Sequence, residues 1–361
     1  MTSLQRLSDA KAKLGAVVSN IDTALTGFAR APFEKRSSAG HCVHQGYFHI
    51  SQGWNPGAGT FVSSHFRTKD FIVAERAVEP LGMVPVVFNE CESFDGRIWR
   101  GPGYDRLPAV LGDDLVTNAI WSSPNGSGPW SQESNPPPLP REVASLLAHD
   151  GYLYQFLGEA YTGHASPTYA MRTDAYRKAP GGAWVQRASN LPKRRSFAYE
   201  SWNGSIFIIG GADDNYGGNY RKCFASILRS DDGMQTLVNV GDGPFGPAYG
   251  RRSAQFNGHV VLIGGAYGDG GFSDPVAFTN KVWASNHPGL IPESWFEIAS
   301  LPAALNHAAV GVLTVDGVET LAVIGGYNNL THAAGGPLGT IYTLNSLGGS
   351  WLSRSDSDFW V

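Results

Sequence analysis

The chain has 361 residues, of which 42% are hydrophobic and 16% charged, and its formal net charge is −4. This composition supports a large core, argues against disorder, and lacks the overall positive charge typical of nucleic-acid-binding proteins. Three widely spaced cysteines, no CxxC pair and no apolar run of 18 residues argue against a disulfide framework, a zinc site and a membrane-spanning helix.

Residues 3–26 are predicted to form a helix, because they contain no proline and only one glycine, Gly15. Apolar side chains recur in the heptad pattern typical of coiled coils, with Lys11 as the exception, at Leu4, Leu7, Leu14, Val18, Ile21 and Leu25. Such a short helix is marginal alone in water. It must pack on the flank of its own domain, or join several copies or a larger assembly.

The organisation that we predict is therefore an N-terminal attachment or oligomerisation segment, residues 1–28, followed by one β domain, residues 29–361. Polar residues such as Asp9 and Asp22 interrupt any apolar stretch that could serve as a signal peptide, so we expect synthesis in a cytoplasm.

A repeated β-hairpin is the main signal in the rest of the chain. The pairs that open the repeats are Gln45-Gly46, Asp95-Gly96, Asp150-Gly151, Asn203-Gly204, Asn257-Gly258 and Asp316-Gly317. Such pairs between apolar runs predict tight hairpin turns, because both central residues need positive φ. An apolar run ending in Gly-Gly follows in residues 204–211, 258–265 and 319–326, with weaker copies in 46–53, 96–103 and 151–158.

Two further strands are predicted in each repeat. Ser or Thr marks the end of a third strand, at Arg67-Thr68, Trp121-Ser122, Arg172-Thr173, Arg229-Ser230, Ala284-Ser285 and Tyr342-Thr343. Tryptophans mark an outer strand at Trp130, Trp184, Trp295 and Trp351. Four antiparallel strands in each of six units of 50 to 60 residues are typical of a propeller, whose closed ring leaves no long sheet edge exposed.

The strand ending in Gly-Gly, followed by Tyr and Trp positions, resembles the kelch-repeat family over about residues 30–361. The resemblance is strong in repeats four to six, fair in the third and poor in the first two, where Gly-Gly becomes Gln52-Gly53 and Pro102-Gly103. It implies an all-β, six-bladed kelch-type propeller behind a short coiled-coil-like helix, with seven blades as the alternative.

Basic residues near the start of the first strands form one candidate site. They are Arg36, Arg141, Arg194, Arg251 and His307. If the first strands are innermost, these side chains would surround the mouth of a central channel and bind an anionic group through planar guanidinium forks. The alternative is that they only satisfy carbonyls and acids between blades.

The long loops after Gly-Gly lie on the same face as these strand starts and form a second candidate surface. Their aromatic, amide and acidic residues suit sugar recognition, through stacking and hydroxyl contacts. The candidates are Trp54, Asn55, Tyr104, Tyr161, Asp213, Asn215, Tyr216, Tyr220, Tyr267, Asp269, Tyr327 and Asn328.

We assign no metal site, cofactor or catalytic residue. His41 and His44 have opposite parity on a strand, so together with His49 and Cys42 they do not form a ligand set. The run Asp213, Asp214 and Asn215 lacks a complete calcium-loop pattern. No dinucleotide, P-loop or nucleophile-elbow motif is present.

A self-associating helix before a loop-decorated propeller is similar in layout to bacteriophage fibre or spike proteins. We therefore expect a non-enzymatic recognition protein assembled in a bacterial cytoplasm into a virion. Its partners would be other copies, virion structural proteins and host surface polysaccharide, without nucleic acid or membrane insertion. One alternative is a kelch-type sugar enzyme such as a sialic-acid mutarotase, with His307 or Glu142 moving a proton. The other is an intracellular kelch adaptor, resident in the cytoplasm.

Overall fold

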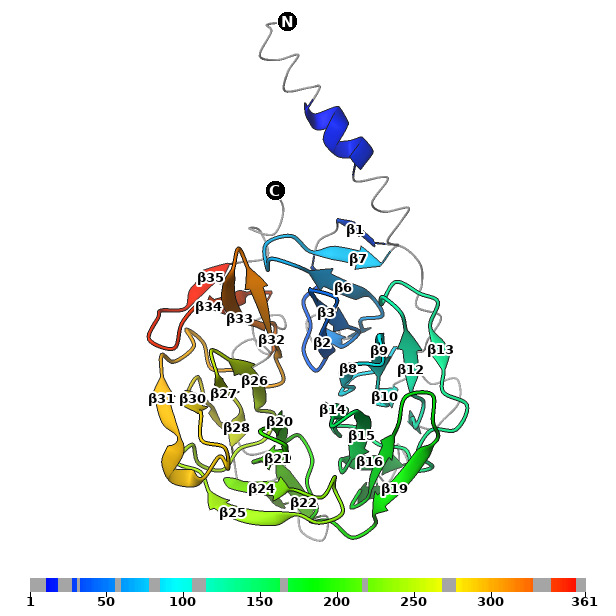
Figure 1. Cartoon of the computed structure of the whole chain (residues 1–361), viewed down its shortest axis with the longest axis vertical. Coiled ribbons are helices and arrows are strands. Elements are labelled where there is room, and N and C mark those ends of the chain that lie inside the picture. Colours follow the sequence, from blue (N-terminus) through cyan, green and yellow to red (C-terminus); the bar gives the residue numbers. More distant parts are fainter. Residues whose placement is uncertain are drawn as a thin grey trace, which may run out of the picture.

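Six β-sheets are arranged as blades around a central axis (Figure 1). The structure, a computed structural model, describes residues 11–18, 28–30, 33–55, 60–77, 85–105, 115–162, 168–215, 220–267, 277–326 and 339–354. The chain is an all-β, six-bladed propeller with a short N-terminal helix, as the repeat predicts, and the seven-bladed alternative is wrong.

Each blade uses four consecutive main strands, counted from the channel outwards. Blade 1 has β2 (Gly40–His44), β3 (Tyr47–Ser51), β6 (His65–Thr68) and β7 (Glu75–Ala77). Blade 2 has β8 (Cys91–Phe94), β9 (Arg97–Arg100), β12 (Trp121–Ser123) and β13 (Ser131–Gln132). Blade 3 has β14 (Leu147–His149), β15 (Tyr152–Phe156), β18 (Ala175–Lys178) and β19 (Trp184–Ala188).

The second half of the ring repeats this order. Blade 4 has β20 (Ala198–Trp202), β21 (Ser205–Ile209), β24 (Ser226–Ser230) and β25 (Val238–Asp242). Blade 5 has β26 (Arg252–Phe256), β27 (His259–Ile263), β30 (Val282–Ser285) and β31 (Phe296–Ile298), with the 3-10 turn η1 (Pro292–Ser294) before its outer strand. Blade 6 has β32 (Ala309–Val315), β33 (Val318–Ile324), β34 (Ile341–Leu344) and β35 (Leu352–Arg354).

The predicted hairpin turns all join the first two strands of a blade. Both residues of every pair have positive φ, from 50° and 77° at Gln45 and Gly46 to 50° and 80° at Asp316 and Gly317. Two-residue loops of this type match the twist of the flanking strands. The sequence therefore fixes the register of the inner hairpin in every blade.

The predicted tryptophans lie immediately before or at the start of the outer strands β13, β19, β31 and β35. The third strands also lie where expected, except in blade 3. There β18 begins at Ala175, so Arg172 and Thr173 precede the strand, and its predicted end was wrong. The backbone carbonyl of Thr173 instead accepts a hydrogen bond from the N–H group of Leu191, which follows the outer strand β19.

The second strand of each blade forms the core, because each blade is packed between two neighbours. Ile206, Phe207, Ile208 and Ile209 in β21 are all fully buried, so adjacent residues face different inter-blade clusters. Burial on both faces explains why these strands read as continuous apolar runs instead of alternating with polar residues.

A closed circle of backbone hydrogen bonds joins the six blades. Each N–H donates to the carbonyl of the preceding blade, at 2.7 to 3.1 Å, through Ser38, Phe88, Val143, Ser196, Gly250 and His307. All six residues have positive φ, which is a costly conformation for Val143 in particular. We call these residues the hydrogen-bonded ring; it closes the first blade onto the sixth without exchanging a strand.

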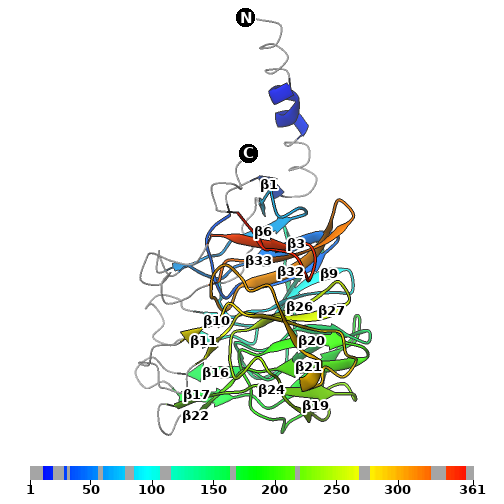
Figure 2. The same cartoon turned by 90° about the vertical axis from the view of Figure 1, so that its left-hand side faces the viewer.

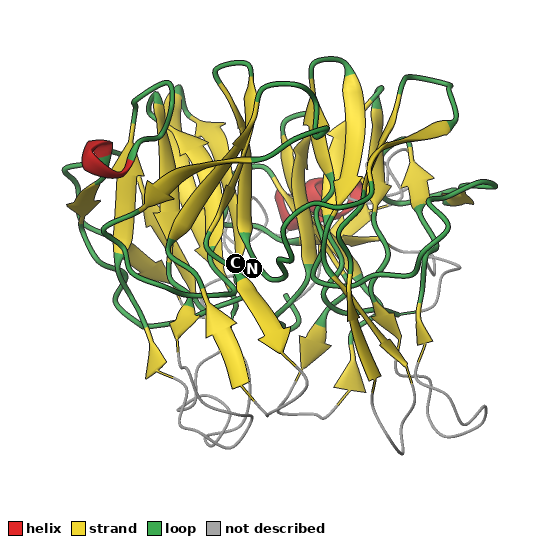
Figure 3. Ribbon diagram, turned by 90° about the horizontal axis from the view of Figure 1, so that it is seen from below, coloured by secondary structure: helices red, strands yellow, loops and turns green. Residues whose placement is uncertain are grey.

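One face of the propeller carries additional short strands after the second strand of blades 1 to 5. They are β4 (Trp54–Asn55), β5 (Thr60–Phe61), β10 (Tyr104–Asp105), β11 (Leu115–Val116), β16 (Glu159–Thr162), β17 (Thr168–Met171), β22 (Ala212–Asn215), β23 (Tyr220–Cys223), β28 (Ala266–Tyr267) and β29 (Ala277–Phe278). They lie on one side of the disc in Figures 2 and 3, away from the inner hairpin turns. The strands β11 and β16 pair, so blades 2 and 3 share a second sheet.

The N-terminal segment has two described parts. Residues 11–18 form a helix drawn away from the ring, and every residue of this helix is exposed. β1 (Phe28–Arg30) pairs with β7 as a fifth strand of blade 1. No helix in the described ranges has the length and hydropathy needed to span a membrane.

Candidate functional site

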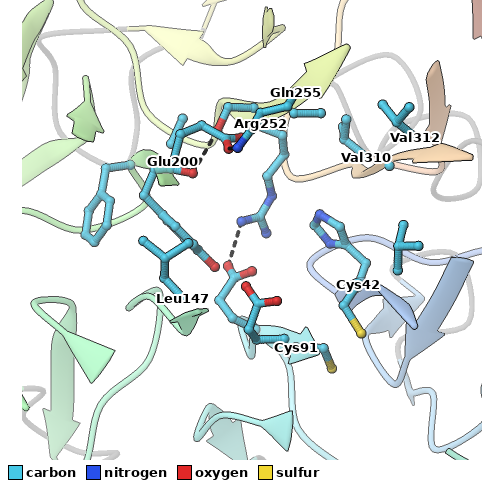
Figure 4. Close-up of a pocket in the computed structure, with 18 residues that line it drawn as sticks. Cys42, Cys91, Leu147, Glu200, Arg252, Gln255, Val310 and Val312 are labelled. Atoms are coloured by element: carbon cyan, nitrogen blue, oxygen red, sulfur yellow. Dashed lines mark hydrogen bonds and ion pairs between the residues drawn. The ribbon is translucent and has the colours of Figure 1, made fainter. Parts of the chain in front are cut away.

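A cavity of about 300 Å³ occupies the central channel (Figure 4). The innermost strands of all six blades contribute to it, because each presents its edge to the axis. Its polar lining side chains are His41, Cys42, Glu90, Cys91, Glu92, Tyr199, Glu200, Arg252, Ser253 and Gln255. The volume is in the range of small-molecule sites.

One ion pair crosses the channel. Arg252 Nη1 of blade 5 lies 2.6 Å from Glu90 Oε1 of blade 2, the blade on the opposite side of the ring. Both side chains are nearly buried, at 10% and 8% exposed. We call this pair the crossbar. It ties together two blades on opposite sides of the ring, across the channel.

The crossbar also forms the floor of the cavity. On its other side lies a second space of about 10 Å³, lined by the crossbar residues and by Phe88, Val143, Ser196, Gly250 and His307 of the hydrogen-bonded ring. This volume admits at most one water molecule. The ring and the crossbar therefore narrow the channel on the loop-bearing face, and the large cavity lies toward the inner hairpin turns.

Glu90 is held by two donors in a desolvated position. Burial raises the pKa of its carboxyl group, while Arg252 and the hydroxyl group of Tyr199 act in the opposite direction by favouring the charged form. The Tyr199 hydroxyl in turn accepts the backbone N–H of Leu146 at 3.4 Å. This arrangement fixes Glu90 as the acceptor of the crossbar.

Two other carboxylates, Glu92 and Glu200, face the cavity without a basic partner among the described residues. Glu200 accepts a hydrogen bond from Gln255 Nε2 at 3.2 Å, and Glu92 accepts the backbone N–H of Ser93 at 2.8 Å. Burial raises the pKa of each carboxyl to about 7. Each therefore changes protonation near neutral pH.

The remaining titratable groups carry no charge at neutral pH. Burial lowers the pKa of His41 to about 3, with Arg252 adding to the effect, so this imidazole is neutral. Burial also raises the pKa of the thiol groups of Cys42 and Cys91. The cavity thus contains one cation, Arg252, against three carboxyl groups, and its surplus charge is negative.

The predicted cationic mouth is not formed, because the four arginines are buried in their own blades. Arg36, Arg141 and Arg251 donate to backbone carbonyls at the end of the second strand, those of Gln52, Leu157 and Gly264 respectively. Arg194 donates to Ser226 Oγ, and its guanidinium lies 3.4 Å from the ring centroid of Phe224. As in the structural alternative stated above, these side chains satisfy carbonyl groups, but the carbonyls of Gln52, Leu157 and Gly264 belong to their own blades and not to neighbouring ones. None of the four arginines lines the large cavity.

His307 occupies a different position from the arginines. It belongs to the hydrogen-bonded ring, and its imidazole lies 5.3 Å from Phe88 and 6.3 Å from Tyr249 between ring centroids. Glu142, the other candidate proton carrier, is buried and pairs through its backbone with Glu159. Neither residue lines the large cavity.

The described loop candidates lie on the face with the short strands. Trp54 and Tyr104 both contact Phe61, with ring centroids 5.3 and 6.2 Å away, so blades 1 and 2 share an aromatic cluster. Asn55 is half-buried and Tyr267 is 44% exposed. Asp213 is half-buried beside Arg194.

Several candidates have no described side chain. Tyr161, Asn215 and Tyr220 lie in β16, β22 and β23, and only their backbone is described. Tyr216, Asp269, Tyr327 and Asn328 lie outside the described residues, as do Leu4, Leu7, Ile21 and Leu25 of the heptad pattern.

The N-terminal histidines are separated by the packing of blades 1 and 2. His41 faces the channel, whereas His44 contacts Ser93 and Pro124, and His49 Nδ1 lies 2.9 Å from His65 Nε2. Across the described ranges, no group of three His, Cys, Asp or Glu side chains is arranged to hold a metal ion.

The sequence contained a signal for the channel residues that was missed. Glu90 and Arg252 each stand six residues before the turn glycine of their blade, and Glu92 and Glu200 stand four before it. The corresponding positions in blade 1 are Gly40 and Cys42. Counting back from each turn glycine therefore identifies which charged residues meet at the axis.

Comparisons with known proteins bear on the fold alone. No protein-family model matches the sequence, and no curated protein matches it. Matches to solved structures number 355 chains. One of them, described as "Structure of YjhT", has a TM-score of 0.66 and 13% sequence identity, covering 90% of this chain and 99% of that chain. At this identity the likeness supports the propeller architecture and says nothing about ligands.

Proposed function

We propose that this chain is a non-enzymatic recognition protein that self-associates through its N-terminal helix and binds a surface glycan with its propeller. The observation that carries this proposal is the helix of residues 11–18, where Leu14 and Val18 of the heptad pattern are 66% and 58% exposed. The setting that fits such a layout is a bacteriophage fibre or spike that contacts a host cell.

A second copy of the chain is the partner that this helix fits best. Exposed apolar side chains at heptad spacing gain stability by packing against the same pattern in another helix. The propeller offers no described contact to residues 11–18, all of which are exposed. Joining several propellers would also raise the weak affinity that single sugar sites usually have, because linked sites bind a polysaccharide together.

Light scattering of the full chain tests the association. We expect the wild type to have a mass several times the 38.7 kDa of one chain. The variant Leu14→Asp with Val18→Asp should be a monomer, because it places charges in the heptad seam. The matched control, Ala12→Asp with Ala16→Asp, adds the same charge at outward heptad positions and should stay oligomeric. A monomeric wild type would contradict the proposal.

A sugar enzyme is a second candidate, favoured by the pKa of about 7 that burial gives Glu92 and Glu200. Carboxyl groups with a pKa near the working pH are effective general acids and bases. If the protein is a recognition protein, NMR should show that sugar anomers exchange in its presence at the same rate as in buffer. An acceleration that disappears in Glu92→Gln or Glu200→Gln would replace the recognition role with catalysis.

A further inference from the structure

We propose that the central cavity binds one amino sugar, with the ammonium group of the sugar between the carboxylates of Glu92 and Glu200. This inference deepens the glycan-recognition part of the proposed function by naming the ligand class. It does not depend on the helix, and it is tested with free monosaccharides, so it and self-association can fail separately.

The charge of the cavity selects a cation. The Arg252 guanidinium is committed to Glu90 at 2.6 Å, so this pair contributes no net charge. Glu92 and Glu200 accept hydrogen bonds only from neutral donors, and His41 remains neutral through burial. An uncompensated buried carboxylate is costly unless a counter-charge approaches it. A ligand ammonium would supply that charge.

The two carboxylates belong to one site. They come from β8 and β20, two blades apart, and each lines the same cavity of about 300 Å³. Figure 4 draws the Glu200 side chain on one side of the space that surrounds Arg252. A single sugar held in this cavity therefore lies against both carboxylates, and the raised pKa of Glu92, to which Glu200 contributes, is consistent with that arrangement.

A second, independent observation points to an oxygen-bearing ligand. The Nε–H group of Arg252 is buried and has no hydrogen-bond partner in the described part of the chain, and only 8% of the residue is exposed. Figure 4 shows this side chain extending into the cavity from β26. A buried donor without an acceptor is unfavourable. A hydroxyl or ring oxygen of a sugar would satisfy it.

The neutral groups around the cavity fit the remaining hydroxyl groups. Gln255 and Ser253 lie beside Glu200, and Tyr199 lies beside Glu90. A volume of about 300 Å³ suits a single sugar ring. The lining thus combines an ammonium site with hydroxyl partners, which distinguishes an amino sugar from a simple amine.

Calorimetry with the full-length protein at pH 7 tests the inference. We expect D-glucosamine to bind, and N-acetyl-D-glucosamine, in which the amine is a neutral amide, to bind at least tenfold more weakly. The diamine 1,4-diaminobutane should also bind more weakly than glucosamine, because it offers no hydroxyl oxygen to Arg252. The Glu92→Gln, Glu200→Gln double variant should lose at least tenfold in affinity for glucosamine.

The controls separate charge from folding. Glu293→Gln removes one exposed carboxylate on η1 and should bind glucosamine as the wild type does. If the double variant does not fold, each single variant should still weaken binding by at least threefold with an unchanged melting temperature. The inference is overturned if glucosamine does not bind, if the acetylated sugar or the diamine binds equally well, or if the glutamine variants keep full affinity.

Discussion

The Arg252→Met variant is expected to lose about 3–5 kcal/mol of unfolding free energy at pH 8, the largest effect of any single change in the channel. The substitution leaves Glu90 as a buried carboxylate, 8% exposed, without its cation. Burial already raises the pKa of this carboxyl, and Arg252 is the main influence holding it down. Urea denaturation measures the loss directly.

The effect should depend on pH in a defined direction. Without Arg252, the pKa of Glu90 rises further above its unfolded value, so as the pH falls from 8 the folded protein takes up a proton before the unfolded chain does. The stability of the variant therefore increases as the pH falls from 8 toward the unfolded pKa. We expect the difference from the wild type to be smaller at pH 5 than at pH 8.

A double variant provides the control for this experiment. Glu90→Gln together with Arg252→Met removes both charges, and it should recover most of the stability lost in Arg252→Met alone. An exposed pair, Lys281 and Glu297, gives the matched comparison, because Lys281→Met should change stability by less than about 1 kcal/mol. Equal losses in Arg252→Met and Lys281→Met would show that the crossbar does not support the ring.

Local signals were sufficient to predict the propeller. The six pairs of a polar residue and glycine at the hairpin turns needed no knowledge of the rest of the chain, because positive φ at two consecutive residues is a property of the turn itself. The apolar second strands were equally visible, since Ile206 to Ile209 are buried whichever blade they face. Six copies of these local signals then determined the ring.

The structure explains the weak copies in the first three blades. The first glycine of Gly-Gly is replaceable, because Gln52 in blade 1 and Leu157 in blade 3 adopt positive φ there, at 56° and 57°. The second glycine is not replaceable. A Cβ atom at Gly53, Gly103 or Gly158 would lie 2.7, 2.5 or 2.6 Å from a backbone carbonyl oxygen. The essential signal was therefore one glycine and not two.

The channel could not be predicted in the same way, because its contacts join residues far apart in sequence. Glu90 and Arg252 are separated by 162 positions. Their meeting depends on the number of blades and on the register of two separate strands. The arginines at the strand starts were predicted to form a ligand site, yet Arg36 and Arg141 are buried and donate to backbone carbonyls of their own blades. The type of residue gave no indication of that difference.

Gly158→Ala should reduce the free energy of unfolding by roughly 3–5 kcal/mol, from two additive causes. The residue has φ of 93°, which L side chains rarely adopt. Its added Cβ would lie 2.6 Å from the Glu142 carbonyl oxygen and 2.7 Å from Ala144 Cβ. The N–H group of Gly158 also donates to the backbone carbonyl oxygen of Arg194 at 3.0 Å, so a shift of this glycine disturbs the contact between blades 3 and 4.

Gly151→Ala, at the turn of the same blade, separates the two causes. Gly151 also has positive φ, at 73°, but a Cβ there would meet nothing within 4 Å. It should lose only the conformational part, roughly 1–2 kcal/mol. Urea denaturation of both variants yields the difference, which measures the clash with the backbone of the first strand. If the two losses were the same, close approach would not explain why this glycine recurs at the end of each second strand.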